Sequence, residues 1–184
     1  MSVIKIETPL TDEIIKTLNI GDEIHLSGII YTARDAAHKK LVNLINDNKS
    51  LPFDPVGSVI YYVGPSPAKP GKPIGAAGPT TSYRMDPFVP EMFKAGIKGM
   101  IGKGQRSQEV IETIIRHTGI YFGATGGAAA LLAKSIVKAE VIAFEELGAE
   151  AVRKLEVVNM PLIVINDCFG KDLYKEGRKK WSKI

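Results

Sequence analysis

The sequence predicts an α/β or α+β fold, because strand-like runs interleave with helical patterns along the chain. Its 184 residues correspond to about one domain of typical size, so we expect a single compact domain over 1–184. Hydrophobic residues make up 45% of the chain and charged residues 24%, which are values typical of globular proteins. These values exclude wholesale disorder, collagen and coiled coil.

The N-terminal part alternates strands with helices. Residues 3–7 alternate apolar and polar side chains, which predicts an edge strand, and the apolar run 24–31 predicts a second strand. Between them, Thr11 precedes two acidic residues and begins a short helix. Residues 56–63 are rich in β-formers and predict a buried strand.

A clear amphipathic helix is predicted over 33–47. Its apolar side chains recur at i, i+4, i+7 and i+8 and form one stripe: Ala37, Leu41, Leu44 and Ile45. Thr32 stands three residues before Asp35, which is the spacing of an N-cap followed by an acidic N3 residue. We therefore expect this helix to begin near Ala33.

The remaining chain contains one long irregular loop and several short elements. Residues 64–79 hold five prolines and four glycines, so they cannot form regular structure, and loops of this length usually have a function. We expect helices at 87–95, 106–118 and 128–133, strands at 99–101, 120–122, 139–144 and 162–165, and an exposed basic tail at 175–184.

Charge and cysteine content narrow the function classes. The net charge of +4 suits an anionic ligand but falls short of a nucleic-acid-binding signature. The single cysteine, Cys168, excludes an intramolecular disulfide and any metal or cluster site built from several cysteines of this chain. We see no signal peptide and no run of ~18 apolar residues, so we expect a cytoplasmic protein that binds neither membrane nor nucleic acid.

Five polar residues stand at the end of a predicted element or beside a glycine or proline break, and glycine lets a backbone approach a ligand closely. Arg34 lies at the first turn of a helix, Thr80, Thr81 and Arg84 follow the irregular loop, and Lys103 lies between two glycines. Arginine pairs with carboxylates through two parallel hydrogen bonds. Two arginines, a lysine and two hydroxyls could together hold a small dicarboxylate.

Each of these residues also has an ordinary structural interpretation. Arg34 and His38 are compatible with a solvated or packed helix face, and Asp35 with a helix cap. Arg84 could simply pair with Asp86. P-loop, dinucleotide-binding, zinc-ligand and Gly-x-Ser-x-Gly patterns are absent from the sequence.

Four segments together resemble the β subunit of class I fumarate hydratase and L-tartrate dehydratase. Residues 78–86 read Gly-Pro-Thr-Thr-Ser-Tyr-Arg-Met-Asp, 102–104 read Gly-Lys-Gly, and 32–38 read Thr-Ala-Arg-Asp-Ala-Ala-His. The Glu-Glu-Leu-Gly segment at 145–148 also fits. The resemblance covers nearly the whole chain, and the Thr-Thr-Ser-x-Arg-Met run is its specific signal.

The resemblance implies a swivelling β/β/α domain of the α/β class. It implies an oxygen-sensitive hydro-lyase that interconverts fumarate and L-malate in the tricarboxylic acid cycle, or acts on L-tartrate. The 4Fe–4S cluster of such enzymes belongs to an α subunit or N-terminal domain, which agrees with the lone Cys168. We therefore expect a hetero-oligomer that is active only with its cluster-bearing partner, and leave a homodimer open. A non-catalytic, anion-binding regulatory subunit is the alternative from another class.

The resemblance also assigns roles to the polar residues. Four would bind the carboxylates and hydroxyl of the substrate: Arg34, Thr81, Arg84 and Lys103. Thr80 would be the base, with Lys103 and His38 as further catalytic groups and Asp35 as a secondary candidate. No metal ligand is expected in this chain. Dehydration needs a Lewis acid on the leaving hydroxyl, a base at the adjacent carbon and cations near the carboxylate, and this chain would supply the last two.

Overall fold

The computed structural model describes residues 3–124 and 129–182. The strands are β1 (Ile4–Glu7), β2 (Glu23–Thr32), β3 (Val59–Tyr61), β4 (Gly99–Gly102), β5 (Ile120–Gly123), β6 (Ile136–Ala143) and β7 (Val152–Asn166). The α-helices are α1 (Asp12–Ile15), α2 (Asp35–Asn46), α3 (Val89–Lys94), α4 (Gln108–Arg116), α5 (Ala129–Lys134) and α6 (Leu173–Trp181). Two 3₁₀ segments, η1 (Ser82–Phe88) and η2 (Glu145–Glu150), complete the described elements.

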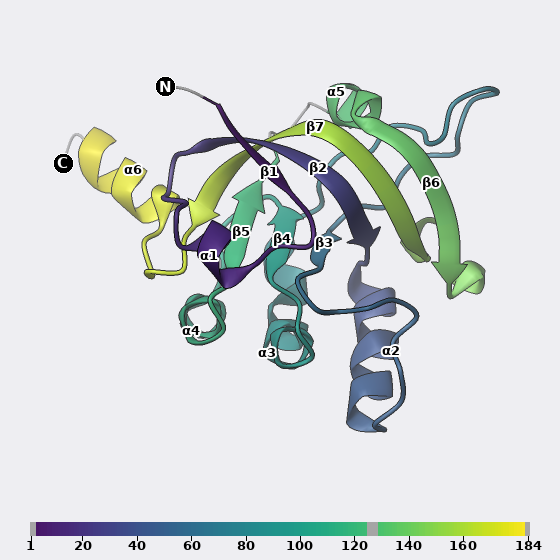
Figure 1. The fold of residues 1–184 in the computed structure, drawn as a ribbon, viewed down its shortest axis with the longest axis horizontal. Coiled ribbons are helices and arrows are strands. Elements are labelled where there is room, and N and C mark those ends of the chain that lie inside the picture. The colour runs from purple at the N-terminus through teal and green to yellow at the C-terminus, as the bar shows by residue number, and fades with distance from the viewer. Residues whose placement is uncertain (1–2, 125–128, 183–184) are drawn as a thin grey trace.

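The strands form one sheet that closes on itself like a barrel (Figure 1). Their order is β1-β2-β3-β4-β5-β7-β6, and an additional pairing of β2 with β7 closes the ring. Strands β2 to β5 run parallel to one another, whereas β7 runs antiparallel to β2 and β5. The fold is therefore α/β, as the interleaved sequence patterns predicted.

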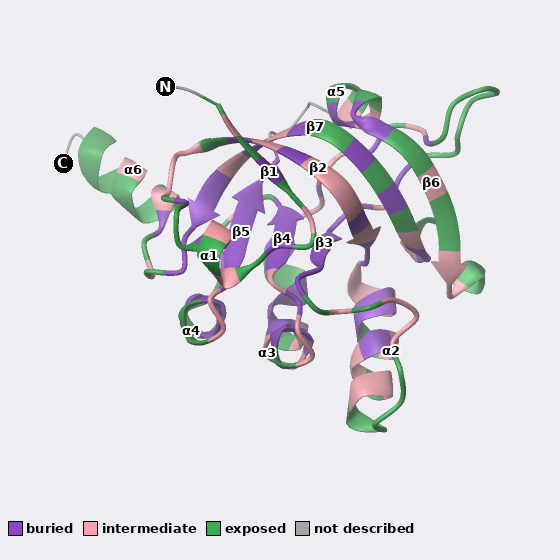
Figure 2. Cartoon of the chain, viewed as in Figure 1, coloured by how far each residue is buried: buried purple, intermediate pink, exposed green. Residues whose placement is uncertain are grey.

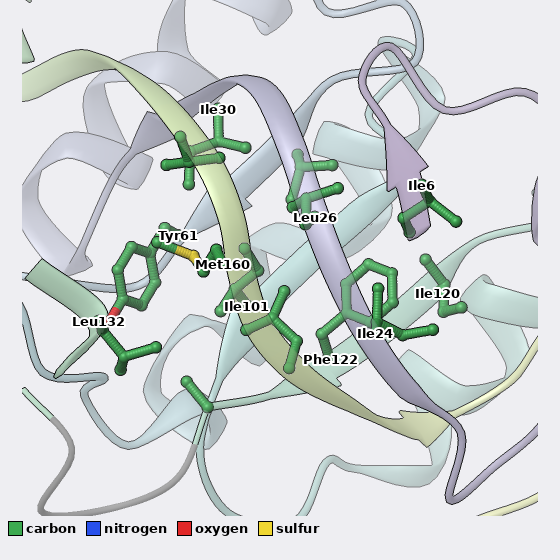
Figure 3. Close-up of a cluster of buried hydrophobic side chains, with 14 of the residues drawn as sticks. Ile6, Ile24, Leu26, Ile30, Tyr61, Ile101, Ile120, Phe122, Leu132 and Met160 are labelled. Carbon is green, nitrogen blue, oxygen red and sulfur yellow. The ribbon is translucent and has the colours of Figure 1, made fainter. Parts of the chain in front are cut away.

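Strand alternation divides the core into an inner and an outer cluster. On β3, Val59 and Tyr61 belong to the inner cluster, whereas Ile60 belongs to the outer one. Figure 3 shows the inner cluster, with Leu26 and Phe122 among its buried side chains. The outer cluster packs helices α2, α3 and α4 against β3, β4 and β5, and these helices lie on one side of the sheet in Figure 1. Figure 2 shows that β3 to β5 are buried along their whole length.

Most predicted elements are present with the expected type, but several boundaries differ. Two of these differences, near the start of β3 and of α2, have a clear physical reason. The strand expected over 56–63 contains only Val59–Tyr61, because the preceding residues turn and Ser58 N–H donates to Pro55 O. Helix α2 begins at Asp35 rather than near Ala33. Thr32 does not cap it, because its hydroxyl donates to Ala151 O and accepts from Arg153 N–H in β7.

The C-terminal half contains more regular structure than the sequence predicted. Strand β7 is 15 residues long, whereas only 162–165 was expected. The basic tail begins as helix α6, capped by the Asp172 carboxylate, which accepts from the N–H groups of Tyr174 and Lys175. The helix expected over 128–133 is α5, and its first predicted residue, Ala128, lies outside the described residues.

Residues 64–79, here called the arm, have no regular structure but are tied at their base. Val63 forms a β-bridge with Pro79, and Ser66 N–H donates to Ala76 O. The tip at 66–73 is exposed, and it projects from the body beside β6 in Figure 1. After the arm, the chain comes back beside the end of β4, where Thr81 forms a β-bridge with Lys103. Across the described residues, no helix is long and apolar enough to cross a membrane.

Candidate functional site

Five candidate residues follow the carboxyl ends of three neighbouring parallel strands. Arg34 comes after β2, Thr80, Thr81 and Arg84 come after β3 and the arm, and Lys103 comes after β4. Parallel neighbours place their carboxyl ends at the same edge of a sheet, which is where α/β folds bind ligands. The topology therefore gathers residues that are far apart in the sequence.

Ion pairs and hydrogen bonds connect the first part of this group. Asp35 Oδ2 lies 3.7 Å from Arg34 Nη2 and 3.6 Å from Arg84 Nη2. Arg84 Nη2 donates to Thr80 Oγ1 over 2.6 Å. Asp35 therefore stands between the two guanidinium groups, and Arg84 in turn contacts the hydroxyl that the sequence predicted to be the base.

The two guanidinium groups retain donors for a further ligand. Both distances to Asp35 Oδ2 exceed hydrogen-bonding reach, so neither guanidinium group is hydrogen-bonded to that carboxylate. Arg34 Nε is buried and has no hydrogen-bond partner among the described residues. Both arginine side chains are partly exposed. A small carboxylate could therefore approach the exposed part of each guanidinium group, beside the contacts of Arg34 Nη2 with Glu150 and of Arg84 Nη2 with Thr80.

Lys103 is joined to the same group through the backbone. Thr81 and Lys103 form a parallel β-bridge, and Ser82 N–H donates to Lys103 O over 2.9 Å. In return, Lys103 N–H donates to Ser82 Oγ over 3.0 Å. The Lys103 side chain is exposed and forms no ion pair with any described residue. Its ammonium group is therefore available to an anion.

The strand end below Lys103 requires glycine because Ser82 approaches it closely. A Cβ atom at Gly102 would overlap Ser82 Oγ. Gly104, on the other side of Lys103, has φ +87°, which side-chain-bearing residues rarely adopt. Both glycines around Lys103 thus have a structural cause, and together they fix where the lysine leaves the sheet.

A buried hydrogen-bond network supports this turn. Tyr121 OH donates to Gly104 O over 3.0 Å, so it accepts the 2.9 Å hydrogen bond from Ser82 Oγ. Burial raises the pKa of Tyr121 well above its ordinary value, so the phenol keeps the proton that it donates. The backbone on both sides of Lys103 is therefore held by neutral hydroxyl groups.

A buried ion pair lies behind the network. Arg106 Nε donates to Asp86 Oδ1 over 2.8 Å, and Ser107 N–H donates to Asp86 Oδ2 over 2.7 Å. The Arg106 guanidinium lies near the Tyr62 and Tyr121 rings, with its carbon 5.3 Å and 4.8 Å from their centroids. Asp86 is therefore committed to Arg106, and the alternative that it pairs with Arg84 is wrong.

Glu150 is a member of the group that sequence reasoning did not single out. Its Oε1 lies 3.3 Å from Arg34 Nη2, and its Oε2 accepts from Ala36 N–H over 3.1 Å. The N-cap residue of α2, Arg34, makes no side-chain cap hydrogen bond. Glu150 thus caps helix α2 from η2, 114 positions away along the chain. The nearby Glu-Glu-Leu-Gly segment was the only available signal.

His38 lies behind the group rather than on its surface. Its ring is 1% exposed and packs against Tyr62 and Phe88, with Nδ1 3.0 Å from Arg34 O. Burial lowers the pKa of His38 to about 4, so the ring is neutral at pH 7 and Nδ1–H donates to the carbonyl. The structure thus places His38 where it holds the backbone of Arg34.

The group as a whole is suited to an anion. It contains the three cations Arg34, Arg84 and Lys103 and the two carboxylates Asp35 and Glu150. Both carboxylates lie beside arginine, whereas the Lys103 side chain is exposed and both arginine side chains are partly exposed. Tyr83, which lies between Thr81 and Arg84 in the sequence, is 63% exposed and adds a large ring beside the group.

Comparisons with known proteins agree over nearly the whole chain. A family model described as the fumarase C-terminus matches residues 1–177. The chain is 42% identical over 177 residues to a Methanocaldococcus jannaschii protein called putative L(+)-tartrate dehydratase subunit beta, covering 93% of this chain and 91% of that protein. It is 40% identical over 159 residues to the anaerobic class I fumarate hydratase of Escherichia coli, covering 85% of this chain and 29% of that enzyme.

A third relative, fumarate hydratase 2 of Leishmania major, is 39% identical over 160 residues, which are 85% of this chain and 28% of that protein. The chain thus spans most of the archaeal protein but less than a third of these two fumarate hydratases. Since the family match covers 1–177, the chain belongs to the fumarase C-terminus family.

Proposed function

We propose that this chain is the substrate-binding β subunit of a hydro-lyase that reversibly hydrates fumarate to L-malate. The observation that carries the proposal is the meeting of Arg34, Arg84 and Lys103 with Thr80 and Thr81 at the carboxyl ends of β2, β3 and β4. A C4 dicarboxylate offers two anionic ends to this set of cations. Each arginine fork takes carboxylate oxygens, and Lys103 and Thr81 take the remaining carboxylate oxygen and the hydroxyl.

Thr80 is the proton-transfer group in this proposal. Its hydroxyl is a weak base, but the hydrogen bond from the Arg84 cation to Oγ1 favours the deprotonated form. In the dehydration direction, the alkoxide oxygen takes the proton from the carbon next to one carboxylate. The electron pair of that C–H bond forms the C=C bond as the C–O bond on the neighbouring carbon breaks. The proton held by Thr80 then passes through solvent to the released hydroxide, which gives water and restores the Thr80 alkoxide. The arginines stabilise the charge that builds on the carboxylate.

The described residues of this chain do not fit an iron–sulfur cluster. The lone cysteine, Cys168, is buried, and burial raises the pKa of its thiol, whereas a cluster binds several thiolates. The described residues also contain no group of three His, Cys, Asp or Glu side chains that could hold a metal. We therefore assign the 4Fe–4S cluster, and the Lewis acid it supplies, to a partner α subunit.

The open side of the group is where that partner completes the site. The M. jannaschii relative is called a subunit beta. In the E. coli and L. major relatives, the matched region is less than a third of the whole protein. His38 and Asp35 act here as positioning residues, because one holds the Arg34 backbone and the other separates the two guanidinium groups.

L-Tartrate is the second candidate substrate. It is favoured by the name of the M. jannaschii relative, whose match covers 93% of this chain and 91% of that protein. Fumarate is favoured by the fumarate hydratase names of the other relatives. Both substrates present two carboxylates, so the cations alone do not separate them.

The experiment is anaerobic purification of the tagged chain with its native partner, followed by turnover of L-malate, fumarate and L-tartrate. We expect a coloured complex that dehydrates one of these substrates, and an isolated chain that stays colourless and inactive after incubation with iron and sulfide. The double variant Arg34→Met, Arg84→Met should assemble normally but lose turnover. A stable cluster on the isolated chain would refute the two-subunit assignment, and unchanged turnover in the double variant would favour a regulatory subunit.

A further inference from the structure

The first residue of the arm, Gly64, lies against the guanidinium group of Arg34. A Cβ atom added to Gly64 would lie 2.8 Å from Arg34 Nη1 and 3.3 Å from Arg34 Cδ. Ordinary contacts between non-bonded heavy atoms lie at about 3.5–4.0 Å, so the arginine leaves no room for a side chain at Gly64. The backbone of the arm therefore forms one wall of the space that Arg34 occupies.

The backbone conformation of Gly64 does not itself require glycine. Its φ angle is not positive, unlike that of Gly104 beside Lys103. Apart from Arg34, the nearest atom that an added Cβ would meet is Ala149 O at 3.5 Å, which is an ordinary contact. The guanidinium group of Arg34 is therefore the neighbour that explains glycine at this position.

The other terminal nitrogen of Arg34 lies beside two acids. Its Nη2 is 3.3 Å from Glu150 Oε1 and 3.7 Å from Asp35 Oδ2. Because a guanidinium group is a rigid plane, a displacement of Nη1 also moves Nη2 and changes the direction of every donor on the fork. The arm at one nitrogen and the acids at the other together fix the orientation of the fork.

The backbone at the base of the arm is held on both sides of Gly64. Val63, the preceding residue, forms a β-bridge with Pro79, and Pro65, the following residue, is buried. The end of the Arg34 side chain is flexible by comparison and partly exposed. A methyl group at Gly64 would therefore displace the guanidinium group and leave the arm in place.

We propose that Gly64 is a positioning residue for substrate binding, because its lack of a side chain lets the arm hold the Arg34 guanidinium in the orientation that meets a carboxylate. The inference rests on the proposed function in so far as Arg34 binds substrate. The contact between the arm and the guanidinium group does not depend on any activity, so it is tested separately.

The first test uses Gly64→Ala in the full chain and needs no substrate. Arg34 Nε is buried, so its proton exchanges slowly with water and gives a cross-peak in ¹H–¹⁵N NMR spectra. Arg34→Lys identifies this cross-peak by removing it. In Gly64→Ala the cross-peak should move by more than its line width, while backbone signals far from the arm stay in place. The matched control Gly177→Ala adds the same methyl group in open space on α6 and should not move it.

The second test measures turnover by the complex with the α subunit. Gly64→Ala should lower kcat/KM at least about tenfold, since a displacement of about 1 Å in a binding group can cost ~100-fold. Gly177→Ala should behave like the wild type. In the Gly64→Ala background, Arg34→Lys should cost much less than in the wild-type background, because the fork is already displaced. A glycine with only a structural role would give additive losses.

The two tests separate failure of the inference from failure of the proposed function. A moved cross-peak with wild-type turnover would support the contact and refute the substrate role of Arg34. An unmoved cross-peak, or additive losses in the double variant, would overturn the inference. If Gly64→Ala does not fold by circular dichroism, adding Arg34→Lys should restore folding, because lysine has no atom at the Nη1 position. A double variant that stays unfolded would also overturn the inference.

Discussion

One guanidinium nitrogen of Arg84 has two partners: it donates to the Thr80 hydroxyl and lies near the Asp35 carboxylate. Its Nη2 lies 2.6 Å from Thr80 Oγ1 and 3.6 Å from Asp35 Oδ2. A planar fork can meet these two partners and still offer donors to a substrate, whereas an ammonium group is a single point of charge. The identity of this residue therefore matters beyond its charge.

Arg84→Lys is expected to lower kcat/KM for the complex although the positive charge is retained. Loss of one charge-assisted hydrogen bond weakens transition-state binding by ~1.5–3 kcal/mol, which corresponds to about a ten- to hundredfold decrease. Steady-state turnover of the preferred substrate measures the effect. The control Arg116→Lys, on the exposed end of α4, should behave like the wild type. Equal kinetics for both variants would argue against a substrate role for Arg84.

Thr80 is expected to act in the transition state rather than in substrate binding alone. Thr80→Ala removes the hydroxyl that accepts from Arg84, so kcat should fall more than KM rises. Thr80→Ser keeps the hydroxyl and should recover most of the lost kcat. If Thr80→Ala changed only KM, the hydroxyl would be a binding group and the base would lie elsewhere.

At the residue scale, the sequence predicted the cations better than their supports. Arg34, Arg84 and Lys103 stand beside visible breaks in the chain, and a short motif connected them to a known family. Arg106 and Glu150 gave no comparable signal, because their partners come from distant segments. Contacts of this kind depend on the tertiary fold and cannot be seen in local spacing.

Among the secondary-structure elements, the segment that follows β4 is held in place by the buried ion pair between Arg106 and Asp86. Asp86, in η1, joins Arg106 to the N-terminus of α4 through its contacts to Arg106 and Ser107. The Arg106 side chain is fully buried. An unpaired guanidinium in that position would have no access to water, so the pair fixes the relation between η1 and α4.

Asp86→Asn is expected to lower the free energy of unfolding by about 3–5 kcal/mol, because it leaves a buried cation without its counter-charge. Urea denaturation measures the change. The control Glu176→Gln removes an exposed pair with Lys179 on α6 and should cost less than about 0.5 kcal/mol. A loss below ~1 kcal/mol for Asp86→Asn would mean that water reaches Arg106 after all.

The sequence patterns missed parts of elements that lack a continuous apolar run. In the first part of β7, exposed Lys154 and Glu156 alternate with buried Leu155 and Val157, which is the pattern of a half-buried strand, but the prediction at 162–165 followed only the apolar run. The expected cap at Thr32 failed because β7 takes its hydroxyl. The strongly apolar strands were predicted from their continuous apolar runs. The amphipathic helices α2 and α4 were predicted because their buried residues lie on one helix face.

At the scale of the whole molecule, the buried His38 makes stability depend on pH. Burial lowers the pKa of His38 from 6.5 to about 4 in the folded chain, so the unfolded chain binds a proton more readily between these values. Stability is therefore fully present above pH 6.5 and should decrease by about 3 kcal/mol as the pH falls to 4.

Urea denaturation at several pH values between 4 and 7 measures this slope. His38→Gln should flatten it, whereas His25→Gln leaves His38 in place and should keep it. His117, whose pKa is lowered by partial burial and then by Lys98, adds in the same direction, so slopes are compared rather than single values. An unchanged slope in His38→Gln would show that other groups cause the dependence.

The closed sheet has a consequence for the order in which the protein is made. Strand β7 pairs with β2 and β5, and Glu150, just before β7, completes the start of α2 across 114 positions. A ribosome-bound chain that ends before Glu150 therefore has β2 with its β7 edge uncovered and Arg34 without its second acid. Pairing across such sequence distances is slow and leaves strand edges open to other chains meanwhile. The anion-binding group is consequently among the last parts of the molecule to mature during synthesis.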